Sequence, residues 1–233
     1  MPPPNKIIGI LGGMSHESTT TYYTYINRHI NERLGGWHSA NILLHSFNFA
    51  PIVELQTTGQ YSELGKRLAK AAARLLDQGA ELIIMACNTM HHVSAGIEEL
   101  GVPFLHIVDA VGEKIKRDEV EKVALLGTRF TMENGFFANR LDEKFGVKTV
   151  VPDEKDRILV EKIIWDELGH GVVTEKGRKE YQRIVKDLEE RGAQGVILGC
   201  TEIGFLLKEG DVDIKLWDTT LVHAEAAAKW AMT

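Results

Sequence analysis

The sequence of 233 residues contains only two cysteines and has no long apolar run. Disulfide scaffolds of secreted proteins are usually short and rich in cysteine, so the disulfide interpretation is the weaker one here. No apolar stretch approaches the roughly 20 residues that a membrane-spanning helix needs. The opening Met1-Pro-Pro-Pro-Asn5 also lacks the charged and apolar regions of a secretory signal. We therefore expect a cytoplasmic protein with reduced thiols and no membrane partner.

Runs of basic charge and nucleotide-binding glycine motifs are missing as well. The formal charge of −6 is spread over mixed segments such as 114–122 and 176–191, so nucleic acid is not an expected partner. Gly9-Ile-Leu-Gly-Gly-Met14 has neither GxGxxG spacing nor a following GxxxxGK. Two interpretations of Gly12-Gly13 stay open: backbone amides that approach a small anion such as a carboxylate, or a tight strand-to-helix turn without a ligand.

Short apolar runs alternate with helical patterns along the whole chain. The runs fit buried parallel strands and cover residues 6–11, 41–45, 82–86, 104–108, 123–126, 149–151, 195–198 and 214–217. Helical spacing of apolar residues occurs in 18–34, 63–78, 131–145, 156–167 and 174–191. This alternation predicts an α/β fold with doubly wound parallel sheets. With 44% hydrophobic residues, the chain can bury one large core or two modest ones.

The two cysteines occupy matching positions of an internal duplication. Three pairs of segments correspond in order: 8–12 with 123–127, 75–89 with 188–202, and 105–109 with 214–218. The middle pair shares five identities at one offset, and the last of them aligns Cys87 with Cys200. A repeat of about half the chain indicates two related α/β units, since each is long enough to hold several strands and helices.

Both cysteines fall at the carboxyl ends of expected strands, where open parallel sheets bind their ligands. Residues 12–15 and 127–129 fall at two further strand ends. Each cysteine precedes polar residues at a helix start, where backbone amides and the helix dipole favour the thiolate. A thiolate opposite a thiol can move a proton on and off a carbon from opposite faces, as in racemisation or epimerisation beside a carboxylate. The alternative is that each cysteine is a small buried hydrophobe.

The chain resembles the cofactor-independent aspartate/glutamate racemases, and in particular their broad-specificity amino-acid racemase branch. The resemblance spans nearly the whole chain and is carried by Gly9-Ile-Leu-Gly-Gly-Met14 with Ser15-His-Glu-Ser-Thr19, Cys87-Asn-Thr-Met90, Leu126-Gly-Thr128 and Gly199-Cys-Thr-Glu202. It implies two pseudo-symmetric α/β domains with the substrate in a cleft between them. It also implies that Cys87 and Cys200 are opposed acid/base catalysts, that no pyridoxal phosphate or other cofactor is used, and that the protein is a homodimer.

The resemblance further implies which residues line the substrate pocket: Met14, Ser15, Gln56, Asn88, Thr89, Thr128, Thr201 and Glu202. Basic side chains hold the distal carboxylate in aspartate-specific relatives. Arg129, Lys176 and Arg178 are candidates for that role, with solvated surface charges as the alternative, so the preferred amino acid stays open. The expected domains are 1–109 with 217–233, which carries Cys87, and 110–216, which carries Cys200.

Histidines near the first cysteine do not indicate a metal. Cys87 and His91 have i, i+4 spacing, but no CxxC or HxxxH supplies the remaining ligands. We expect one of His91 and His92 to be buried and the other exposed. His106, Asp109 and His223 are interpreted as structural residues.

Three functions remain open. The leading one is an amino-acid racemase without a cofactor. The second is a related enzyme such as a hydantoin racemase or maleate isomerase, in which one cysteine can act as a nucleophile. The third is a nonenzymatic amino-acid-binding protein. The two cysteines argue against the third, because binding alone requires no paired acid and base.

Overall fold

The computed structural model describes residues 5–233, which form two compact units. The first unit extends to Ile107 and also contains His223–Thr233, and the second unit is Val108–Val222. The predicted return to the first domain at residue 217 falls inside the last strand. Because that whole strand pairs within the second sheet, Trp217 and Asp218 lie in the second unit.

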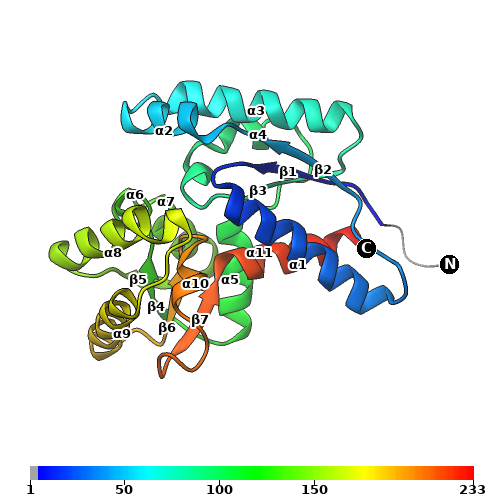
Figure 1. Ribbon diagram of the computed structural model, residues 1–233. Helices are drawn as coiled ribbons and strands as arrows, with labels where there is room; N and C mark the ends of the chain where they lie inside the picture. The colour runs from blue at the N-terminus through cyan, green and yellow to red at the C-terminus, as the bar shows by residue number, and fades with distance from the viewer. Residues whose placement is uncertain (1–4) are drawn as a thin grey trace. The chain divides into compact units, whose positions relative to one another are not determined.

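The first unit is built on a parallel sheet with strand order β2-β1-β3. Its strands are β1 (Ile8–Gly12), β2 (Ile42–Ser46) and β3 (Leu82–Met85). Its helices are α1 (His16–Leu34), α2 (Phe49–Thr57), α3 (Tyr61–Asp77), η1 (Thr89–Val93) and α4 (Ala95–Glu98), together with most of α11 (Thr219–Ala231). In Figure 1, α3 and α4 lie on one side of the strands and α1 and α11 on the other.

Alternating side chains of β1 supply the cores on both faces of this sheet. Leu11 belongs to the core that contains α3, whereas Ile8 and Ile10 belong to the core of α1 and α11. Successive residues of a strand point to opposite faces, so one apolar run can serve both layers. The first unit is therefore doubly wound, as predicted.

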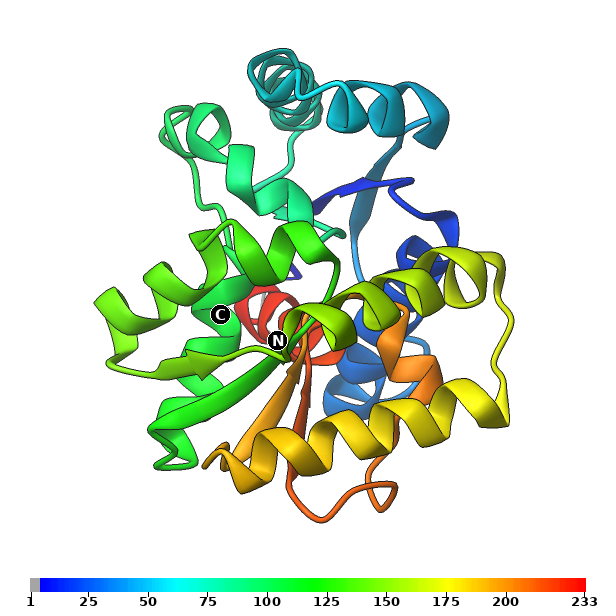
Figure 2. The ribbon, with the colours of Figure 1, turned by 90° about the vertical axis from the view of Figure 1, so that its left-hand side faces the viewer.

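The second unit is built on a parallel sheet with strand order β5-β4-β6-β7. Its strands are β4 (Lys122–Leu126), β5 (Lys148–Val150), β6 (Gly195–Leu198) and β7 (Lys215–Asp218). Its helices are α5 (Ile107–Arg117), α6 (Arg129–Glu133), α7 (Phe136–Phe145), α8 (Glu154–Asp166), η2 (Leu168–His170), α9 (Glu175–Glu190) and α10 (Ile203–Leu206). Figure 2 shows α8 and α9, coloured yellow-green and yellow, along one side of these strands, where they share a core with them.

Strand register confirms the duplication over its first two segments. Ile10 pairs with Ile84 in the first sheet, and Leu125 pairs with Ile197 in the second. The sequence alignment matches these two pairs with each other. The predicted α/β fold with two related parallel sheets is thus confirmed.

For the third pair of segments, the strand pairing gives a different alignment from the one predicted from the sequence. Ile83 forms an isolated parallel bridge with Phe104, and its counterpart Val196 pairs with Leu216. Phe104 therefore corresponds to Leu216, and two residues further His106 corresponds to Asp218. The predicted strand 104–108 was wrong beyond this bridge, because α5 already begins at Ile107.

Part of the repeated sequence encodes the ends of helices. Ala80 N–H donates to the Leu75 carbonyl at 3.0 Å, and Ala193 N–H donates to the Leu188 carbonyl at the same distance. The preceding glycines have φ of 98° and 90°, which places them in the left-handed conformation that commonly ends a helix. Three of the five identities thus have a structural explanation.

Two further features of the chain bear on the expectations. The predicted helix 131–145 is interrupted, because Gly135 adopts φ 87° between α6 and α7. No helix within residues 5–233 is long and apolar enough to cross a membrane.

Candidate active site

The loop after β1 is a tight turn in the first unit. Gly13 has φ 81°, and a Cβ there would collide with the backbone of Phe47. The Gly13 N–H donates to the Thr19 hydroxyl at 2.8 Å, and Thr19 in turn donates to the Ser15 carbonyl at 2.7 Å. The Gly13 amide is therefore engaged within the protein, which favours the turn interpretation over anion binding at this amide.

Met14 and Ser15 continue this loop into α1. Met14 is buried in the core that contains α3, and Ser15 is the N-cap, whose side chain accepts a hydrogen bond from Ser18 N–H at 3.3 Å. Ser15 thus has a structural role of its own. Gln56 lies on α2 after β2 and is half-buried.

Cys87 follows β3 at the same edge of the sheet. Asn88 and Thr89 come next and are 3% and 8% exposed. Cys87 is partly buried and is not in a disulfide. The parallel strands bring this loop beside the β1 loop, because Ala86 N–H donates to the Leu11 carbonyl at 2.9 Å. The first sheet therefore gathers Met14, Ser15, Cys87, Asn88 and Thr89 at one edge.

A group of buried histidines lies behind the Cys87 loop. His91 and His106 have ring centroids 4.6 Å apart, and the His91 and His223 centroids are 5.8 Å apart. The His91 ring nitrogen Nδ1 lies 2.8 Å from the Cys87 carbonyl oxygen. His91 is buried and His92 is half-buried, so the expectation of one buried histidine is confirmed, whereas its neighbour is less exposed than expected.

Burial favours the neutral form of two of these histidines, His91 and His223. It lowers the pKa of His91 well below 6.5, and the nearby His106 and His223 lower it further. Burial also lowers the pKa of His223 to about 4. His223 Nε2 lies 2.9 Å from the Leu105 carbonyl oxygen, and Nδ1 lies 2.8 Å from the Tyr22 hydroxyl. Since a carbonyl only accepts, the Nε2–H tautomer donates to Leu105 and Nδ1 accepts from Tyr22.

In the second unit, two strand ends approach closely at glycines. A Cβ on Gly127 would lie 2.9 Å from the Gly199 carbonyl oxygen, and Gly199 N–H donates to the Leu126 carbonyl at 2.6 Å. Larger residues would separate these backbones. The close approach brings Thr128, after β4, beside Cys200, after β6.

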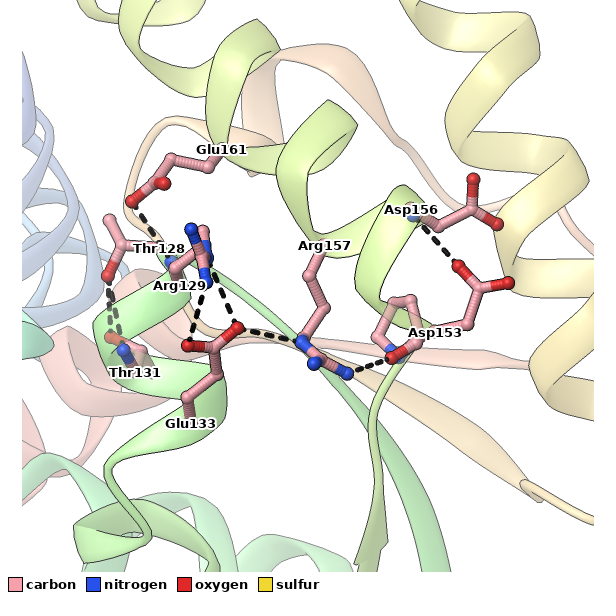
Figure 3. A network of polar contacts seen from close by, with 9 residues as sticks. Thr128, Arg129, Thr131, Glu133, Asp153, Asp156, Arg157 and Glu161 are labelled. Carbon is pink, nitrogen blue, oxygen red and sulfur yellow. Dashed lines mark hydrogen bonds and ion pairs between the residues drawn. The ribbon is translucent and has the colours of Figure 1, made fainter.

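Thr128 begins α6 as its N-cap. Its hydroxyl accepts from Thr131 N–H at 3.2 Å and lies 3.1 Å from the Thr131 hydroxyl (Figure 3). Arg129 N–H donates to Glu161 at 3.2 Å, which ties the same turn to α8. The turn after β4 is thus held by side chains on both sides.

Cys200, Thr201 and Glu202 form a short hydrogen-bonded group. The Cys200 thiol donates to Glu202 Oε2 at 3.0 Å, and the Thr201 hydroxyl donates to the same oxygen at 2.7 Å. Glu202 is only 7% exposed. A buried carboxylate that accepts from a thiol favours the protonated form of that thiol, because the thiolate would place a second negative charge beside it.

The basic candidates for a distal carboxylate are engaged elsewhere or exposed. Arg129 pairs with Glu133, which also binds Arg157 (Figure 3). Arg178 donates to the Leu206 carbonyl and pairs with Asp211 at 2.7 Å. Lys176 is exposed on α9. In the described structure Arg178 connects α9 with the loop after α10, as a structural residue would.

The described residues contain no set of metal ligands. Among residues 5–233, no group of three or more His, Cys, Asp or Glu side chains is placed to hold a metal ion. The histidine group behind Cys87 was visible in the sequence only as the i, i+4 spacing of Cys87 and His91. That spacing reflects a hydrogen bond from the ring to the Cys87 carbonyl.

Similarity to known proteins agrees with these observations. The family model described as Asp/Glu/Hydantoin racemase matches residues 11–227. A candidate Asp/Glu racemase from Yersinia pestis is 46% identical, with coverage of 98% of this chain and 100% of that chain and a TM-score of 0.93. An aspartate racemase homologue from Pyrococcus horikoshii is 35% identical over 98% of this chain and 100% of that chain, with a TM-score of 0.86.

Among curated proteins, a glutamate racemase from Limosilactobacillus reuteri is 26% identical over 156 residues, which is 66% of this chain and 55% of that protein. The chain thus spans about half the length of the curated relatives that it matches. The family match extends over both cysteine loops and both sheets. On this basis the chain belongs to the Asp/Glu/Hydantoin racemase family.

Proposed function

We propose that this protein is an amino-acid racemase that uses Cys87 and Cys200, and no cofactor, to interconvert L and D enantiomers. The observation that carries the proposal is the duplication, which places a cysteine at the equivalent strand end of each sheet. A cysteine beside buried polar neighbours at both strand ends is what a pair of acid and base catalysts requires. Membership in a family of racemases supports the same reaction class.

In the proposed reaction, a thiolate removes the proton from the substrate Cα, and the electron pair of the broken C–H bond moves into the α-carboxylate. The thiol on the other face then gives its proton to Cα, and the configuration inverts. This requires one thiol and one thiolate in each direction.

Stabilisation of the carbanion is the difficult step, because no cofactor imine spreads its charge. We assign this to hydrogen-bond donors from Asn88, Thr89 and Thr128, and from Thr201 once its hydroxyl turns from Glu202 to the substrate, aimed at the α-carboxylate as it gains enediolate character. All four side chains are buried at the strand ends, where a low dielectric strengthens such bonds. Each tenfold rate enhancement needs roughly 1.4 kcal/mol, so several donors must act together.

The resting proton distribution follows from the Cys200 loop. Glu202 accepts from the Cys200 thiol, so we propose that Cys200 is the protonated partner and Cys87 the thiolate before substrate binds. Met14, Ser15 and Gln56 complete the proposed pocket. We propose an acidic amino acid as the preferred substrate, because the similar proteins are named as glutamate and aspartate racemases. Reduced thiols fit a cytoplasmic location, and a homodimer is proposed from the family.

The test is incubation with L-aspartate, L-glutamate and a panel of other L-amino acids in deuterated water without cofactor. Cα deuterium and the D-enantiomer are followed together, with C87S and C200S variants beside the unchanged protein. Exchange with inversion that either variant abolishes supports the proposal. Circular dichroism of both variants checks that they are folded.

The related-enzyme alternatives give different results in the same experiment. A maleate isomerase forms a covalent adduct on one cysteine and acts on a dicarboxylate without an α-ammonium group. Mass spectrometry of the protein with maleate or a hydantoin would detect that adduct or that turnover. No exchange with any amino acid would overturn the proposed racemase.

A further inference from the structure

The two cysteine loops rest on different side chains, although the duplication makes their backbones equivalent. The offset that aligns Cys87 with Cys200 also aligns His91 with Gly204. The strand register aligns His106 with Asp218. In the first unit the two imidazole rings meet, whereas in the second the Asp218 carboxylate occupies the space that a Cβ on Gly204 would need.

The backbone carbonyls of the two cysteines are held in correspondingly different ways. Ile203 N–H donates to the Cys200 carbonyl at 3.1 Å. In the first unit, the His91 N–H donates to the Asn88 carbonyl at 3.1 Å within the 3₁₀ turn η1. The His91 ring nitrogen Nδ1 lies 2.8 Å from the Cys87 carbonyl. The Cys87 carbonyl thus has a side-chain donor, His91, and the Cys200 carbonyl has a backbone donor, Ile203.

The tautomer of His91 follows from its surroundings. A carbonyl oxygen only accepts, so Nδ1 must carry the hydrogen in this contact. Nε2 is buried and has no hydrogen-bond partner among residues 5–233. The ring is stacked on Phe104, with centroids 5.7 Å apart and planes at 28°. His91 is therefore a neutral, packed donor, whose ring hydrogen-bonds to the backbone at Cys87 and also at Asn88.

We propose that His91 is a positioning residue for Cys87, whose ring N–H fixes the peptide that follows the cysteine and thereby the direction of its thiol. The catalytic meaning of this rests on the proposed function, in which Cys87 exchanges a proton with Cα. The peptide plane after Cys87 and the Cys87 side chain branch from the same residue, so rotation of one displaces the other. A displacement of about 1 Å can lower a rate by about 100-fold.

The first measurement is the alkylation rate of Cys87 by iodoacetamide, made in a C200S background so that Cys87 is the single thiol. His91→Phe keeps a flat ring against Phe104 but removes the donor. His91→Asn places an amide N–H near the position of Nδ1. We expect alkylation about fivefold faster in the first variant, as the loss of one hydrogen bond allows, and within about twofold of the parent in the second.

The matched control is His92→Phe. His92 is the next residue and is half-buried. Its ring packs edge-on against the ring of Tyr61, with centroids 5.3 Å apart. This variant should alkylate at the parent rate. An equal rate in His91→Phe and its parent, or no restoration by His91→Asn in a protein with unchanged Tm, would overturn the positioning role.

A second measurement covers the case in which His91→Phe does not fold. Long-range ¹H–¹⁵N correlation spectra of the unchanged protein report which ring nitrogen of His91 carries the proton. The Nδ1–H tautomer is expected, and the Nε2–H tautomer would refute the contact. Neither readout requires turnover, so failure of the racemase proposal and failure of the positioning proposal are distinguishable.

In active protein, His91→Phe in the background with both cysteines should lower kcat by 10- to 100-fold, roughly the effect of misplacing a reacting group. KM should stay within about twofold, since the donors to the carboxylate remain. A change confined to KM would contradict the positioning role.

Discussion

Acid destabilisation of the first unit should depend on His223, which is buried between Tyr22 and the Leu105 carbonyl. Its pKa is lowered by burial to about 4 from 6.5. Between these values the unfolded chain binds a proton that the folded chain does not. The stabilising contribution of neutral His223 is therefore complete above pH 6.5 and is lost as the pH falls toward 4.

The magnitude follows from linkage. With pKa values of 6.5 and about 4, preferential protonation of the unfolded chain destabilises the protein only slightly at pH 7 and by about 2 kcal/mol at pH 5. His223 should thus account for a loss of about 2 kcal/mol between these conditions. The lowered pKa of His91 acts in the same direction.

His223→Gln tests this directly. A glutamine amide can donate to the Leu105 carbonyl and accept from the Tyr22 hydroxyl, but it does not titrate. The free energy of unfolding is measured by urea denaturation at pH 7 and pH 5. The loss between the two pH values should be smaller in the variant by about 2 kcal/mol.

Comparing His223→Gln with the unchanged protein separates the effect of His223 from the effects of other titrating groups. The raised pKa of Asp218, caused mainly by burial, opposes the acid loss equally in both proteins. His38→Gln is the control, because His38 is exposed in the loop after α1, and it should keep the pH dependence of the unchanged protein. If His223→Gln also kept that dependence, the neutral buried histidine would be refuted.

Two further predictions concern the second unit. Glu202→Gln removes the charge that accepts from the Cys200 thiol, so Cys200 should be alkylated faster at pH 7 in a C87S background; an unchanged rate would contradict its role in holding the proton. Gly204→Ala would force a methyl group into the Asp218 carboxylate. Its free energy of unfolding should fall by about 1–3 kcal/mol, typical of overpacking, and an unchanged value would show that α10 moves without strain.

Local sequence patterns predicted most of the strands and the longer helices. Seven of the eight expected strands overlap strands of the structure. They were identifiable because a strand buried on both faces is a short continuous apolar run. The failures occurred where the pattern was short: 104–108 contributes only one bridge residue before α5 begins. A 3.6-residue period also continued across Gly135, whose positive φ breaks the helix.

The site was predicted in part. The alignment of Cys87 with Cys200 needed only the repeated sequence, and the strand register agrees with that alignment. The roles of the pocket residues come from the resemblance and stay predictions. The contact between Cys200 and Glu202 could be suspected from their spacing alone, whereas for His91 the sequence predicted only that one residue of the His91–His92 pair is buried.

The sequence by itself determined the duplication, the helix ends that repeat with it and the positions of both cysteines, because these depend on local hydrogen bonds and apolar spacing. Only the tertiary structure decided what lies behind each cysteine. Tyr22 and His223 meet across 201 positions, and the Asp218 carboxylate meets Gly204 after the chain has left and rejoined the sheet. Burial of these groups, which fixes their charge and their hydrogen-bond directions, arises from packing that no local pattern contains.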